Sequence, residues 1–126
     1  MANEDDDILT EEEATLYWDA FFAAVRVLIT AQSKLEELED NTEDLGERAG
    51  LRADRERLGD ELALLNQRHV AFIVGKTAIT PPKKKTVDSI VKLVEEVANL
   101  EAERNNVNAI LKIATTAAEQ IAKLES

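Results

Sequence analysis

The sequence has no cysteine, and its 126 residues include only four glycines, two prolines and one histidine. The absence of cysteine excludes disulfides, thiol nucleophiles and cysteine-based metal sites. The single histidine, His69, has no glutamate three residues before it and no histidine or glutamate four residues away. Carboxylate-bridged metal sites in helical bundles need such spacing. We therefore predict a protein without enzyme activity, catalytic residues, metal or cofactor, in which His69 is a core residue hydrogen-bonded to a neighbour.

Positive charge is also scarce, because 15 lysines and arginines stand against 26 aspartates and glutamates, a net charge of −11. Such a charge repels nucleic acid and anionic membranes and attracts a basic protein. The chain begins with acidic residues where a secretory signal is basic and then apolar, and no apolar run reaches the roughly 20 residues of a membrane span. We expect a cytoplasmic protein whose partner is another, basic protein or a second copy of itself. Nucleic acid is not expected as a partner, and a membrane is disfavoured.

Abundant alanine, leucine, glutamate and lysine favour helices. Apolar residues recur at spacings of three and four along three segments, about 11–40, 45–74 and 86–124, as in helices that pack like coiled coils. Glycine and proline mark a linker over 75–85. We predict an acidic flexible tail at 1–9. It is followed by a single all-α domain over 10–126, an antiparallel bundle of three long helices.

The third helix has two possible forms. Unbroken, its nearly 40 residues would extend about 60 Å, which is longer than its neighbours. The polar stretch EAERNNVN interrupts its apolar pattern. The helix therefore either continues through Asn105 and Asn106, or breaks there to give a fourth helix.

The first helix has more apolar surface than an ordinary surface helix, which shows a single stripe of about 100°. One apolar row is the seam that contains Tyr17 and Leu28, and a second row contains Leu16 and Val27. Two neighbouring helices would leave part of this cylinder uncovered. We expect the helix to be central in its own fold, or to form an interface. The third apolar row consists of Trp18, Phe22, Val25 and Ile29.

Two acidic clusters, each with seven carboxylates, lie at residues 4–13 and 36–47, at opposite ends of this helix. Negative charge accelerates association with a basic protein, and aromatic side chains are frequent binding hot spots. We therefore predict a partner-binding surface that joins the third apolar row to the second acidic cluster. Its residues are Trp18, Phe22, Val25, Ile29, Glu36, Glu37, Glu39, Asp40, Glu43 and Asp44.

These observations favour a non-enzymatic helical protein–protein interaction module. In its most concrete form it is an acidic cognate inhibitor, of the immunity or antitoxin type, that blocks a basic protein. The alternative is a self-assembling coiled-coil scaffold, an oligomer whose partner is itself. A third hypothesis is a membrane-active helical protein that releases its first helix into a bilayer.

Overall fold

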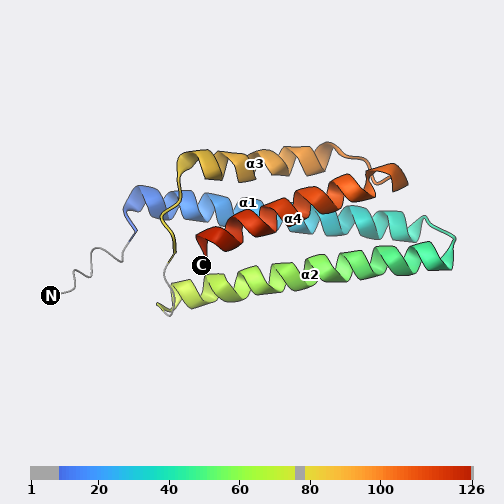
Figure 1. The fold of residues 1–126 in the computed structure, drawn as a ribbon, viewed down its shortest axis with the longest axis horizontal. Helices are drawn as coiled ribbons and strands as arrows, with labels where there is room; N and C mark the ends of the chain where they lie inside the picture. The colour runs from blue at the N-terminus through green and yellow to red at the C-terminus, as the bar shows by residue number, and fades with distance from the viewer. Residues whose placement is uncertain (1–8, 76–78, 126) are drawn as a thin grey trace.

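The computed structural model describes residues 9–75 and 79–125, and this part of the chain forms an all-α bundle of four helices (Figure 1). The predicted antiparallel bundle is confirmed, with the third predicted helix broken into two. Each helix runs antiparallel to the one before it along the chain (Figure 1). A short 3-10 helix, η2 (Arg104–Asn106), precedes the last helix. The four are α1 (Glu11–Asp40), α2 (Leu45–Ile73), α3 (Lys84–Asn99) and α4 (Val107–Leu124).

The predicted N-terminal tail and the predicted linker each include residues that lie outside the described part of the chain. The predicted flexible tail covers residues 1–8, which are not described, and Leu9, which packs against the core. The predicted linker contains residues 76–78, also outside the described ranges. After them, Ile79 is buried, and the backbone N–H of Thr80 donates to the carbonyl of Leu124 at 2.8 Å. This part of the linker is therefore fastened to the end of α4.

Side-chain caps fix where α1 and α2 begin. The Thr10 hydroxyl accepts from the backbone N–H of Glu13 at 3.1 Å, and the Glu13 carboxylate accepts from the N–H of Thr10 at 2.9 Å. This capping box satisfies two N–H groups that have no partner inside the helix. Asp44 caps α2 in the same way, accepting from the N–H of Glu47 at 2.9 Å.

The break between α3 and α4 has a local cause. Leu100 adopts an extended backbone, and the Asn106 side chain donates to the carbonyl of Glu101 at 3.0 Å. Asparagine side chains offer the backbone such an alternative to helical hydrogen bonds. Arg104 forms an ion pair with Glu47 in the first turn of α2. The chain therefore turns back at this point, and α4 returns along the bundle.

Helix α1 is the centre of the bundle, because it packs against each of the other three helices. Figure 1 shows α2 and α3 on either side of α1, with α4 lying across it. The predicted seam of α1 is buried, with Tyr17, Leu28 and Leu35 fully covered. The face that α4 turns inward consists of Ile110, Ala114, Ala117 and Ile121.

One part of the predicted seam is wrong by a single residue. The three-four spacing of the last segment predicts a seam of Leu111, Ala114, Ala118 and Ile121. Ala114 and Ile121 are buried, but Ile110 and Ala117 are buried in place of Leu111 and Ala118. The reason is the break. Because α4 starts as a new helix, its buried residues do not continue the three-four spacing of the buried residues of α3.

Candidate protein-interaction surface

The outer strip of α1, formed by Trp18, Phe22, Val25 and Ile29, lies on the side of the central helix that its neighbours do not fully cover. The Phe22 side chain is 59% exposed and the Ile29 side chain is 52% exposed. Trp18 and Val25 are half-buried and pack against the core. The structure thus brings the four predicted residues together as a partly open apolar surface.

Aromatic contacts hold the N-terminal half of the outer strip in place. The Trp18 ring meets the His69 ring of α2 edge-on, with centroids 4.6 Å apart. On its other side Trp18 stacks on Phe22, with centroids 5.4 Å apart. Phe22 is therefore positioned by Trp18 while most of its own surface remains in solvent.

An open groove runs beside the outer strip, between α1 and α3. Val91 of α3, which is 45% exposed, lines it opposite Phe22. The charged groups along its edges are of both signs, with Arg26 and Lys92 against Asp88 and Glu95. The groove is thus apolar at its floor and mixed in charge at its rim. Its lining consists of Phe22, Ala23, Arg26, Asp88, Val91, Lys92, Val94, Glu95 and Ala98.

The predicted acidic residues do not share one environment. Five of them are exposed beyond the end of the strip, namely Glu36, Glu37, Asp40, Glu43 and Asp44. Asp44 also caps α2. Glu39 is different, because it is only 3% exposed and faces α2.

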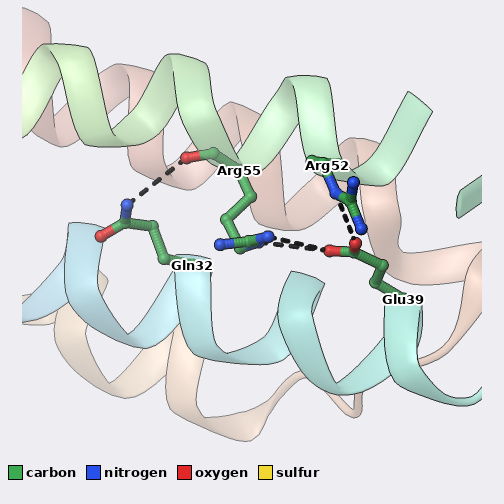
Figure 2. Close-up of polar contacts among 4 residues, drawn as sticks. All are labelled: Gln32, Glu39, Arg52 and Arg55. Carbon is green, nitrogen blue, oxygen red and sulfur yellow. Dashed lines mark hydrogen bonds and ion pairs between the residues drawn. The ribbon is translucent and has the colours of Figure 1, made fainter. Parts of the chain in front are cut away.

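Figure 2 shows Glu39 between two arginines of α2. Arg52 donates to one carboxylate oxygen at 2.9 Å, and Arg55 donates to the other at 3.2 and 3.3 Å. Burial raises the pKa of Glu39, but these hydrogen bonds outweigh it and hold the pKa below its ordinary value. Glu39 thus fastens α1 to α2, and we leave it out of the accessible surface.

A buried polar cluster at the other end of the bundle could not be deduced from the sequence. The Tyr17 hydroxyl lies 2.9 Å from Nδ1 of His69 and donates to Oε2 of Glu125 at 3.0 Å. Each of the three residues is less than a tenth exposed. The hydrogen bond predicted for His69 is confirmed. Tyr17 and His69 both occupy seam positions, whereas nothing in the pattern marks Glu125.

Burial shifts the titration of all three groups. It lowers the pKa of His69. Burial also raises the pKa of Tyr17, and the negative charge of Glu125 raises it further. For Glu125, burial outweighs the hydrogen bond from Tyr17 and the positive charge of Arg68, and raises the pKa to about 7. Because the cluster is enclosed, it joins α1, α2 and α4 rather than facing a ligand.

The described residues were also compared with what a metal site and a membrane span require. Within residues 9–75 and 79–125, no group of three or more histidines, aspartates or glutamates could hold a metal ion.

Helix α1 is long and apolar enough to cross a membrane by length and composition, contrary to the estimate from apolar runs. A covered core helix meets the same criterion, and 44% of the apolar window of α1 is buried in the bundle.

No protein-family model, curated protein or solved structure matches this chain. The functional proposal therefore rests on exposure, charge and packing alone.

Proposed function

We propose that this chain is a non-enzymatic protein-interaction module that docks a partner on the outer strip of α1. The single observation that carries the proposal is the exposure of Phe22 and Ile29, at 59% and 52%, in the middle of the most central helix. Large apolar side chains that lie together on a surface are typical of protein contacts. Aromatic residues are also enriched among binding hot spots.

Phe22 and Ile29, the exposed residues of the strip, do not need to be apolar for folding alone. The buried seam of α1 already meets α2, α3 and α4, so the exposed side chains add little to this packing. Covering a large apolar side chain contributes about 1.5–3 kcal/mol. A partner that covers Phe22, Ile29 and Val91 would gain this free energy without any change in the bundle.

Site-specific photocrosslinking in the cells that make the protein tests the proposal. A benzoylphenylalanine in place of Ile29 should give a crosslinked protein product. The same group in place of Leu64, which is 46% exposed on α2, serves as the matched control. Equal yields from the two positions, or no product from position 29, would overturn the proposal.

The acidic inhibitor of a basic protein is a more specific form of the same function. The exposed carboxylates Glu36, Glu37 and Asp40 support it, because they continue α1 beyond the strip. The rim of the groove does not favour it, because Arg26 and Lys92 would repel a basic surface there. Mass spectrometry of the crosslinked product identifies the partner and decides between a basic protein and other occupants.

A further inference from the structure

We propose that the occupant of the outer strip is a second copy of this chain, with the two α1 helices antiparallel and crossing near Phe22. The inference rests on the proposed function, since it names the partner of the same surface. It predicts an isologous contact, in which the same residues serve on both sides.

The first support is the spacing of the residues on the outward face of α1. Six exposed residues follow one another at intervals of four, three, four, three and four. This spacing places the six residues along one face of α1, with the apolar side chains of Phe22 and Ile29 between polar neighbours, so a second helix can lie along it. The inward seam of α1 has the same repeat and is already used within the bundle. The outward residues are Thr15, Asp19, Phe22, Arg26, Ile29 and Ser33.

The second support is the placement of two charges around Phe22. Asp19 and Arg26 are seven residues apart, about two helical turns, and lie on either side of the ring. Neither forms an ion pair with any other residue that the structure describes. A two-fold axis near Phe22 exchanges the two ends of this stretch. Each Asp19 then lies beside Arg26 of the second copy, so the surface is complementary to itself.

The groove beside Phe22 provides the third support. It is an open groove whose lining includes Ala23, Val91 and Val94 beside Phe22. The Phe22 ring of the second copy can therefore be covered by α3 as well as by α1. The contact uses one helical face of 19 residues, roughly 28 Å long. A contact along a single helix face is small, and we expect a weak association.

Sedimentation equilibrium of the full chain, over about 1–500 μM, measures the association directly. We expect a monomer–dimer equilibrium that Phe22→Glu weakens at least about tenfold. Leu64→Glu adds the same charge on α2 and should leave the equilibrium unchanged. Circular dichroism checks that each variant is helical; the Phe22 side chain is 59% exposed and the Leu64 side chain 46%.

Charge reversal tests the antiparallel register itself. Asp19→Arg places arginine beside Arg26 of the second copy, and Arg26→Asp places aspartate beside Asp19, so each variant alone should associate more weakly than the wild type. A mixture of the two variants should form a heterodimer, because both contacts are then of opposite charge. The double variant should form a dimer again.

The outcomes separate this inference from the proposed function. A wild-type chain that is monomeric throughout the range overturns the inference. A dimer that is insensitive to Phe22→Glu, or a mixture that does not recover, also overturns it. If the chain is monomeric but position 29 crosslinks to a basic protein, the proposed function stands and the second copy does not.

Discussion

At Tyr17 a single hydroxyl joins three helices. The group belongs to α1, its neighbour His69 belongs to α2, and its acceptor Glu125 follows the last residue of α4. One oxygen of Glu125, Oε1, is buried without a hydrogen-bond partner. A buried charge without full hydrogen bonding is costly, so the cluster is a point where protonation and stability are coupled.

The stability of the bundle should fall as pH rises through the pKa of Glu125. The folded pKa of about 7 exceeds the ordinary 4.5, so the folded state holds more protons between these values. The contribution of Glu125 is therefore present at low pH and lost as pH rises past 7. Its size is on the order of 3 kcal/mol. Denaturant unfolding of the wild type and of Glu125→Gln from about pH 5 to pH 8 measures it.

The variant is needed because His69 acts in the opposite direction. Its pKa is lowered from 6.5 by burial, so its contribution is lost as pH falls through 6.5 and below. The difference between the wild type and Glu125→Gln removes this effect. We expect that difference to shift in favour of the wild type on acidification. Two parallel curves would contradict the assignment of Glu125.

Glu39 should contribute more to stability than an acid one turn away. Its carboxylate is enclosed and holds Arg52 and Arg55, whereas Glu36 is exposed. Replacing the buried carboxylate weakens its three hydrogen bonds with the two arginines, because hydrogen bonds to a charged acceptor are the stronger ones. We expect Glu39→Gln to lower the melting temperature clearly more than Glu36→Gln. Equal melting temperatures would show that the arginines are satisfied without Glu39.

The stability difference between the wild type and Glu39→Gln should also depend on pH, in a direction set by the lowered pKa of Glu39. Because the pKa of Glu39 is lowered, its contribution is present above the ordinary value of 4.5. It is lost as pH falls through the lower folded pKa. The advantage of the wild type over Glu39→Gln should therefore persist at neutral pH and disappear in acid.

At the scale of the helices, the sequence was most informative where one repeat runs unbroken. The three-four spacing of α1 predicted its buried seam, and Tyr17, Leu28 and Leu35 are fully covered. It was least informative after Leu100, because local hydrogen bonds at Asn106 decide where the chain turns. Which face of α4 points into the core depends on where the chain breaks, so the apolar pattern before and after the break does not determine it.

Two adjacent residues of α1 provide a direct test of its orientation. Leu28 is fully buried, and Ile29 is 52% exposed on the outer strip. Truncating a buried leucine leaves a cavity, and Leu28→Ala should cost about 2–5 kcal/mol of unfolding free energy. Ile29→Ala should cost less than about 1 kcal/mol, since its side chain leaves water only in part. Urea unfolding at a concentration where the chain is monomeric compares the two.

A reversed order of these two costs would mean that α1 is rotated about its axis. The outer strip would then belong to the core. Similar costs at both positions would mean that the outer strip is covered even in the isolated chain. Either result would remove the exposed surface on which the functional proposal depends.

For the whole molecule, the sequence predicted a helical bundle whose first helix has more apolar surface than two neighbouring helices would cover. It did not predict the separation of Glu39 from the other acids, because its arginine partners come from a different helix, more than ten residues along the chain. Contacts of this kind depend on how two helices are aligned. The net charge, by contrast, follows directly from the composition, and it predicts how association of two copies depends on salt.

Association of two copies should strengthen as salt is added. Each copy has a net charge of −11, so the two repel one another at long range. Raising the salt from about 0.01 M to about 0.3 M shortens the screening length from roughly 30 Å to less than 10 Å. The two exposed Asp19–Arg26 contacts weaken at the same time, but exposed ion pairs contribute only about 0–1 kcal/mol each. Sedimentation equilibrium at both salt concentrations should therefore show a tighter dimer at the higher one.

The double variant Asp19→Arg with Arg26→Asp is the control, because it keeps the net charge and should show the same salt dependence. Binding to a basic protein has the opposite sign, since screening weakens attraction between unlike charges. A dimer that dissociates with added salt would mean that ion pairs dominate the contact. The charges of Asp19 and Arg26, rather than burial of the Phe22 ring, would then be the main source of the association.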